Sequence, residues 1–362
     1  MKILDRYIII KIIVTFFFIT IGLQILSVVI DLSQRIHRLE NNQGSIKEAL
    51  IRYYPYFAIW LANTFSPISV FLSIIFVTSQ LNKNSEITAL LVSGISFKRI
   101  TYPYFISAFI IGIGALMINY YLLPIANKKK NKFHYQYLLN SKYKKIYENN
   151  QNISAQISKN EYLFIQNFSR KKNIGKECVY QKFHGKKLIY LIKAKNIFWN
   201  KKYHVYILHN YSEIHIKKNK DIFSKGFYLI KNFYITPKEL LPEEYIAETM
   251  TINELKKFIK IEKKRGNKNI NMFLNEYYQR TSFPFSTFIF TILGLSIISL
   301  NSNKIENHLI IGLFLSFLYI FCIELSKIYS TKNYIPSYLS IWLPNIIFGI
   351  ITIFFWSKKN YH

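Results

Sequence analysis

Long runs of apolar residues alternate with polar segments along the chain, and their length predicts helices that cross a membrane. A helix needs about 20 apolar residues to span a hydrocarbon core of about 30 Å. Six runs meet this requirement: 8–30, 56–78, 100–123, 283–300, 308–326 and 338–356. The first run is followed by Asp31 and Arg35 and not by a small-residue cleavage site, so we interpret it as a span and not as a signal peptide.

Three of these runs precede a polar middle region, and three follow it. Both chain ends are therefore expected on one side of the membrane and the middle region on the other. Basic residues mark cytoplasmic loops, but here they lie on both sides and nearly balance. The side of the chain ends holds Lys83, Lys98, Arg99, Lys358 and Lys359, and the opposite side holds Arg35, Arg38, Lys47 and Arg52.

The middle region alternates short β-branched and aromatic runs with turn signals such as the one at Gly185. We predict strands over 161–168, 178–183, 187–198, 203–216 and 227–235. Short strands at this spacing are typical of an all-β sandwich, barrel or jelly roll. The last strand is apolar on both faces, which fits either a packed core between two sheets or an apolar trough for lipid tails.

A helix is expected after the strands, because Thr251 and Glu254 have the spacing of a capping box. Gly266 is the expected stop at its C-terminal end. The apolar stripe of this helix consists of Ile252, Leu255, Phe258 and Ile259, and lysines lie off it. Such a helix could lie on the membrane surface or pack on the β domain, and the pattern fits both.

The composition narrows the class of protein. The residues are 51% hydrophobic and 17% aromatic, which excludes a disordered chain. Cys178 and Cys322 are the two cysteines, too few for a disulfide scaffold. The formal net charge is +29, and most of it lies within 127–280. Lys, Asn, Ile, Phe and Tyr are over-used together, so compositional bias explains the charge as well as function does, and we infer no nucleic-acid partner.

No motif in the sequence indicates catalysis or metal binding. The nucleotide-binding pattern G-x-x-x-x-G-K-[ST] is absent, as are H-E-x-x-H and G-x-S-x-G. His204, His209 and His215 alternate between strand faces, so we predict no metal site. Glu324 and Lys327, near the end of the fifth run, form either a helix-end ion pair or a polar group that faces the bundle interior. We expect no enzymatic activity, because the apolar runs hold no paired nucleophile and base.

The segment 85–94, between the second and third runs, predicts a short amphipathic helix. Ser85 is the expected N-cap, Glu86 complements the helix dipole, and Gly94 ends the helix. Its apolar ridge consists of Ile87, Leu90 and Leu91. A short helix that projects from two spans can dock into a groove of a soluble partner, or it can lie flat on the membrane.

Several motifs, in order along the chain, resemble the LptF/LptG (YjgP/YjgQ) permeases of lipopolysaccharide export. The segment from Asn84 to Ser96 closely resembles the cytoplasmic coupling segment of that family. The further matches are Leu4 to Tyr7, Pro67, Arg280 with Pro284, and the stretch from Ile335 to Asn345. The order of three spans, a β domain and three spans also fits. The resemblance covers nearly the whole chain, and the ordered set is far more specific than any single match.

The resemblance implies a membrane α-helical fold with six transmembrane helices and an inserted all-β, jellyroll-like periplasmic domain. Transmembrane helices 1–3 would occupy 1–126, with the coupling helix at about 85–94. The β domain would occupy 127–250, the amphipathic helix and its connection 251–280, and transmembrane helices 4–6 the residues 281–362. The protein would be a multi-pass protein of the inner membrane with cytoplasmic chain ends.

The resemblance also implies partners: a second LptF/LptG-type permease, a cytoplasmic ATPase dimer, a periplasmic bridge protein and lipopolysaccharide. ATP and Mg²⁺ would bind to the ATPase, so no cofactor is expected in this chain. Glu86 matches the coupling glutamate, which would pair with a basic residue of the ATPase. The complete coupling set would be Ser85, Glu86, Ile87, Leu90, Leu91 and Gly94.

Contact with the lipid phosphates is expected at the end of the first span. The G-type members of the family have a lysine where this chain has Asp31, so Arg35 or Arg38 could supply the contact instead. Features of both branches are mixed here. The F-type and G-type assignments, and pairing with an identical or a related permease, therefore stay open.

The predicted function is a non-catalytic permease subunit of an ATP-driven exporter, which extracts lipopolysaccharide from the inner membrane and passes it to a periplasmic bridge. Exposing acyl chains to water costs roughly 0.8 kcal/mol per CH₂, and a cavity between helices that continues into an apolar β trough avoids that exposure. The alternative is a membrane-anchored scaffold whose basic β domain binds anionic lipid or polymer without transport. Such a scaffold would not co-purify with an ATPase.

Overall fold

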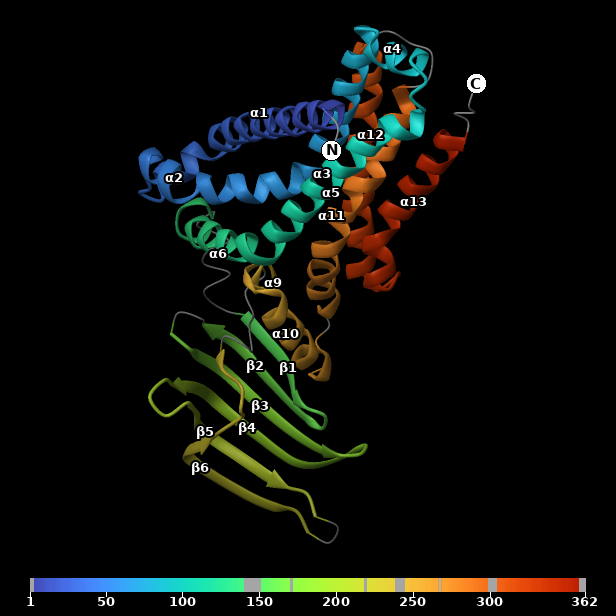
Figure 1. Ribbon diagram of the computed structural model, residues 1–362. Helices are drawn as coiled ribbons and strands as arrows, with labels where there is room; N and C mark the ends of the chain where they lie inside the picture. Colours follow the sequence, from blue (N-terminus) through green and yellow to red (C-terminus); the bar gives the residue numbers. More distant parts are fainter. Residues whose placement is uncertain are drawn as a thin grey trace.

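The computed structural model describes residues 3–139, 151–169, 172–217, 220–237, 245–265, 267, 269–298 and 305–357. It consists of a bundle of long helices and a six-stranded sheet beside one end of that bundle (Figure 1). Three sequence predictions fall outside the described residues. They are the helix stop at Gly266, the end of the fourth apolar run at 299–300, and the terminal Lys358 and Lys359.

The helices follow the apolar runs and extend beyond them. The third run lies in one long helical rod, which consists of four consecutive helical segments from Phe97 to Leu138. This rod extends past residue 126, where the boundary to the β domain was predicted. The helices before the sheet are α1 (Ile3–Asn41), α2 (Ile46–Arg52), α3 (Tyr54–Lys83), α4 (Glu86–Val92), α5 (Phe97–Met117), η1 (Ile118–Leu122), α6 (Leu123–Phe133) and η2 (His134–Leu138). Those after it are α9 (Ile246–Thr249), α10 (Ile252–Lys264), α11 (Ile270–Ile298), α12 (Ile305–Thr331) and α13 (Ser337–Ser357).

Five of the described helices are long and apolar enough to cross a membrane: α1, α3, the rod from Phe97 to Leu138, α12 and α13. The fourth predicted span lies in α11, which packs against α3, α5, α12 and α13 inside the bundle (Figure 1). Its buried face carries hydroxyl groups, and Ser286, Thr287 and Thr291 donate to carbonyls three or four residues earlier in α11. Those residues lower the hydropathy of α11 without leaving unpaired polar groups. The helix is confirmed, and its crossing of the membrane stays a prediction.

Pro284 lies well inside α11, because that helix begins at Ile270. The apolar run alone begins at residue 283, which would place Pro284 in the first turn of a helix, but the helix begins 13 residues earlier. The polar segment from Ile270 to Ser282 is helical as well and joins the apolar run without a break. The physical reason is tertiary: the side chain of Phe273 in this segment packs into a cluster with Leu255 of α10.

The six strands form one antiparallel sheet in the order of the sequence, from β1 to β6. They are β1 (Gln151–Ser158), β2 (Glu161–Ser169), β3 (Ile174–His184), β4 (Lys187–Asn200), β5 (Val205–His215) and β6 (Ile222–Lys231). The predicted strands were correct in place except that β1 was missed and β6 lies earlier than 227–235. The described strands do not form two packed sheets, so a jellyroll is not confirmed.

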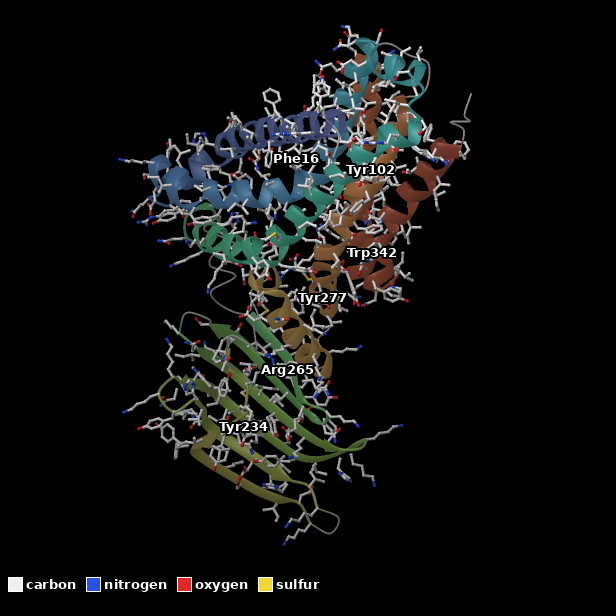
Figure 2. All side chains as sticks on the ribbon, in the orientation of Figure 1. Phe16, Tyr102, Tyr234, Arg265, Tyr277 and Trp342 are labelled. Carbon is white, nitrogen blue, oxygen red and sulfur yellow. The ribbon has the colours of Figure 1, made fainter. Side chains whose placement is uncertain are left out.

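The sheet is covered on one face by the chain that follows β6. Phe233 and Ile235 are buried against that face, where Phe233 contacts the rings of Tyr180 and Tyr206. Between them Tyr234 adopts a left-handed backbone and points outward (Figure 2). The predicted last strand therefore divides into an edge strand and a covering segment. Hydrophobic burial requires this cover, because a sheet with one solvated face still has to bury the other.

The capping box at Thr251 is present, and it starts α10. The Thr251 N–H donates to Glu254 over 2.9 Å, and the Glu254 N–H donates to the Thr251 hydroxyl over 3.4 Å. The apolar stripe of α10 packs mainly on α9 and α11, through Leu255 and Phe258. The sequence had left open the membrane surface and the β domain as the place of this helix, and its observed location differs from both.

Candidate functional site: a coupling helix and a lipid-contact groove

The short helix α4 projects from the bundle at the end opposite to the sheet (Figure 1). Gly94 follows it with a φ of 84°, and the N–H groups of Gly94 and Ile95 donate to Leu91 and Leu90, as expected of a helix stop. The N-terminal prediction was wrong. Ser85 has a left-handed backbone, with φ of 59°, and its side chain makes no capping hydrogen bond. The tight turn after α3 imposes this conformation, whereas a capping side chain needs an extended one.

The apolar ridge of α4 is divided between two surroundings. Ile87 is 9% exposed and packs into the bundle, and Leu90 packs beside it. Leu91 and Val92 are 44% and 83% exposed, so they form the apolar surface that a partner could contact. The expected single ridge of Ile87, Leu90 and Leu91 is therefore not one exposed surface, and the sequence missed Val92.

Glu86 is held by neutral donors at the start of α4. The Tyr7 hydroxyl and the Asn84 amide each donate to its carboxylate over 3.2 Å. In the described part of the chain, no lysine or arginine forms an ion pair with Glu86. Two motifs that lie far apart in the sequence, one at Tyr7 and one at Glu86, thus meet in space. The same N-terminal turn is fixed to α5, because Arg99 donates to both carboxylate oxygens of Asp5 over 2.7 and 2.8 Å.

The predicted lipid-contact residues Asp31, Arg35 and Arg38 take two different roles. Asp31 is buried, and it accepts from Arg35 over 2.8 Å and from the Tyr54 hydroxyl over 3.4 Å. Arg35 also lies 2.9 Å from a ring nitrogen of His134. Asp31 and Arg35 therefore tie α1 to α3 and η2 within the chain. Arg38, by contrast, is exposed.

A groove of about 390 Å³ lies beside this tie, between α2, the start of α3, α6 and η2. It combines cations with aromatic rings, since the Lys129 ammonium donates to the Tyr56 hydroxyl over 2.8 Å and lies 4.7 Å from that ring. Its lining residues are Glu48, Ile51, Arg52, Tyr56, Lys129, Lys132, Phe133, Gln136 and Tyr137. Cations above an apolar floor suit an amphiphile with a phosphate group.

Lys129 and Lys132 were not predicted as site residues, because the β domain was expected to begin at residue 127. The rod continues through it as α6, so residues three apart lie on one face. The spacing of Lys129, Lys132, Phe133 and Gln136 is the signal that could have found this face.

The sequence model of one family, the lipopolysaccharide export system permease LptF/LptG, matches residues 6–358. The chain belongs to this LptF/LptG family. No curated protein matches it. Members of the family are permease subunits of the lipopolysaccharide export system and are not catalytic. This chain is accordingly a multi-pass membrane permease of that system.

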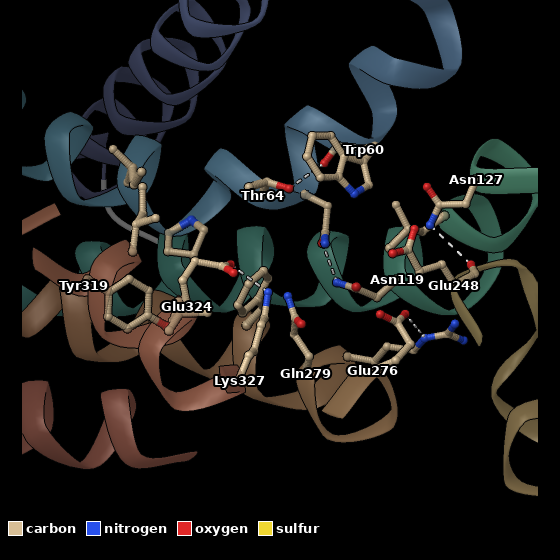
Figure 3. Close-up of a pocket in the computed structure, with 18 residues that line it drawn as sticks. Trp60, Thr64, Asn119, Asn127, Glu248, Glu276, Gln279, Tyr319, Glu324 and Lys327 are labelled. Atoms are coloured by element: carbon tan, nitrogen blue, oxygen red, sulfur yellow. Dashed lines mark hydrogen bonds and ion pairs between the residues drawn. The ribbon is translucent and has the colours of Figure 1, made fainter. Parts of the chain in front are cut away.

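This LptF/LptG permease has a second cavity, of about 200 Å³, where the bundle meets α9 (Figure 3). Glu324 and Lys327, 2.9 Å apart, form the predicted ion pair and also line the cavity. Glu248 of α9 faces the same cavity, with Lys130 at 4.0 Å. Burial, reinforced by the nearby Glu276 carboxylate, raises the pKa of Glu248 to about 7. Sequence reasoning missed Glu248, because nothing local indicates that this side chain is partly buried in the cavity.

Proposed function

We propose that this permease is the membrane-spanning subunit of an ATP-driven exporter that extracts lipopolysaccharide from the inner membrane and passes it to a periplasmic bridge. The observation that carries the proposal is that α4 and the sheet lie at opposite ends of one helical bundle (Figure 1). On this proposal α4 and the chain ends are cytoplasmic, and the sheet is periplasmic. The permease pairs with a second LptF/LptG-type permease, and the lipid lies between the two.

The cytoplasmic end would bind an ATPase dimer, which holds ATP and Mg²⁺. Leu91 and Val92 supply exposed apolar surface for a groove on that subunit. Glu86 can offer its carboxylate to a basic residue of the ATPase, because its present partners are neutral donors. α4 packs on the bundle through Ile87 and Leu90, and this attachment supports its action as a lever.

The lipid would be held where an apolar helix face ends beside cations. The exposed side of α1 carries Phe18, Ile25 and Val29, and Arg38 follows on the same helix. Lys129 and Lys132 of the groove add two more cations for the lipid phosphates. A chain of 12 methylenes moved from bilayer to water would cost about 10 kcal/mol, so an apolar path past α1 is a large part of the mechanism.

The edge strand β6 would receive the lipid and contact the bridge. Among the described strands its one neighbour is β5, so its other edge can pair with a strand of a partner. Its exposed apolar side chains are Ile222, Phe223, Phe227, Tyr228 and Ile230. Ile222, Tyr228 and Ile230 lie on one face of the strand, and Phe223 and Phe227 lie on the other. Exposed apolar groups of this kind at a sheet edge suit contact with an apolar partner.

The lipid step is tested by charge reversal in the groove. The double variant Lys129→Glu/Lys132→Glu should lose most binding of purified lipopolysaccharide, measured by native mass spectrometry of the detergent-solubilised permease. The control Lys256→Glu/Lys260→Glu makes the same charge change on exposed positions of α10 and should bind as the wild type does. An equal loss of lipopolysaccharide binding in both variants would refute the proposal that the groove binds the lipid. If solubilised membranes yield the permease without an ATPase, the scaffold function replaces transport.

A further inference from the structure

The short helix α9 lies between the sheet and α10 in the order of the chain, and a buried arginine holds it. Arg280 of α11 is 1% exposed. Its guanidinium donates to the carbonyl of Met250 over 2.8 Å and to that of Ala247 over 3.0 Å. The third donor, Nε, pairs with Glu276 over 3.0 Å. Because Arg280 binds backbone carbonyls, it fixes the position of α9 and not only a side chain.

A second contact holds α9 from the other side. The Asn127 amide of α6 donates to the carbonyl of Glu248 over 3.2 Å (Figure 3). α9 is thus hydrogen-bonded to both α6 and α11. Figure 2 shows the same region between bundle and sheet, where Tyr277 of α11 and Arg265, just after α10, are labelled. We call this contact between α9, α6 and α11 the joint. The planar guanidinium of an arginine suits it, since it presents several hydrogen-bond donors in fixed directions.

A packed path connects this joint to α4. α3 ends at Lys83, just before α4, and α5 begins at Phe97, just after it. Both helices pack against α11, which carries Arg280 in its N-terminal half. A displacement of α4 would therefore reach α11 through helices in direct contact.

We propose that Arg280 is a positioning residue that transmits movement of the membrane helices to the β domain through α9. The inference rests on the proposed function, in which the lipid passes from the bundle to the β domain. The mechanical link itself concerns this chain alone. It can be tested without the ATPase and without lipopolysaccharide.

The test measures the distance between spin labels on the two parts of the full chain in lipid nanodiscs. Labels go on Lys186→Cys, in a turn of the sheet, and on Lys332→Cys, just after α12, in a Cys322→Ser background. The wild type should give one narrow distance peak. Arg280→Gln should lose this peak and give a broad distribution, and Arg280→Lys should restore part of it, because one ammonium can still reach a carbonyl. An unchanged peak in a monodisperse Arg280→Gln protein would overturn the proposal.

Two further variants separate positioning from general damage. Glu276→Gln/Arg280→Gln removes both charges, so no buried carboxylate is left unpaired, and it should still broaden the distribution. Lys327→Gln removes an ion pair that lines the same cavity but removes no hydrogen bond to α9, and it should keep the narrow peak. Broadening by Lys327→Gln to the same degree would also overturn the proposal.

A second readout applies in the assembled exporter. Arg280→Gln should lower the lipid transferred per ATP hydrolysed by about fivefold, within the range found for residues along a coupling path, and Arg280→Lys should recover part of it. An unchanged ratio in Arg280→Gln would count against the proposal. If the wild-type permease moves no lipid, the proposed function fails, whereas the distance measurement still decides the role of Arg280.

Discussion

The carboxyl group of Glu248 should make the stability of this permease depend on pH. Its pKa is raised from 4.5 to about 7 in the folded protein, first by burial and then by Glu276, and Lys130, Lys327 and Arg280 oppose the shift. Below pH 4.5 the group is protonated in the folded and the unfolded chain, so it has no effect. Between pH 4.5 and 7 the unfolded chain loses its proton first. Stability therefore falls as the pH rises through this window and stays low above it.

The size of the effect follows from the two pKa values. Each unit of difference corresponds to about 1.4 kcal/mol, so the full shift costs the folded state about 3 kcal/mol above pH 7. Replacing Glu248 with Gln removes the ionised form and keeps a similar shape. The variant should gain up to about 3 kcal/mol at pH 8 and almost nothing at pH 4.5.

The assay is thermal unfolding of the detergent-solubilised permease between pH 4.5 and 8. The difference between Glu248→Gln and wild type should widen with pH and level off above pH 7. Glu324→Gln is the matched control, because it makes the same change at an exposed carboxyl that lines the same cavity. A constant difference across the pH range, or an equal slope in the control, would refute the reasoning.

Two further predictions concern other parts of the molecule. Glu86→Lys should abolish the stimulation of ATP hydrolysis by lipid without impairing membrane insertion, because it places a cation against the basic partner expected on the ATPase. The control Glu40→Lys, near the C-terminal end of α1, should behave as the wild type. Full lipid-stimulated hydrolysis in Glu86→Lys would show that Glu86 does not couple the permease to the ATPase. Gly175→Ala should destabilise the β domain by about 1–3 kcal/mol in thermal unfolding, because a Cβ there would lie 2.3 Å from Ile165 and 2.9 Å from Ile197. Ser154→Ala, at an exposed strand position, should change the stability by less than about 0.5 kcal/mol, and an equal effect of both variants would contradict this packing argument.

The sequence alone determined the features that depend on neighbours along the chain. Long apolar runs specify helices because a backbone in lipid must satisfy its own hydrogen bonds. The Thr251–Glu254 capping box and the stop at Gly94 are also local, since each involves groups within a few residues. Strands β2 to β5 were predicted in place for the same reason. The family resemblance rested on such local motifs, and the family match over 6–358 confirmed it.

Other features depended on contacts that no local pattern contains. β1 was missed because its sequence is polar, and it becomes a strand by pairing with β2. The start of α11 at Ile270 was missed because packing on α10 extends this helix towards its N-terminus. Ser85 fails as a cap because the turn after α3 fixes its backbone.

The same division applies to the candidate sites. The sequence identified α4 and the charged end of α1, but only the tertiary structure decided which side chains face outward. It turned Ile87 towards the bundle and left Val92 exposed, and it used Asp31 in an internal ion pair. It also joined Arg280 to α9 across 30 residues. Burial and pairing of this kind depend on which helices become neighbours, and that is set by the packing of the whole chain and not by any one segment.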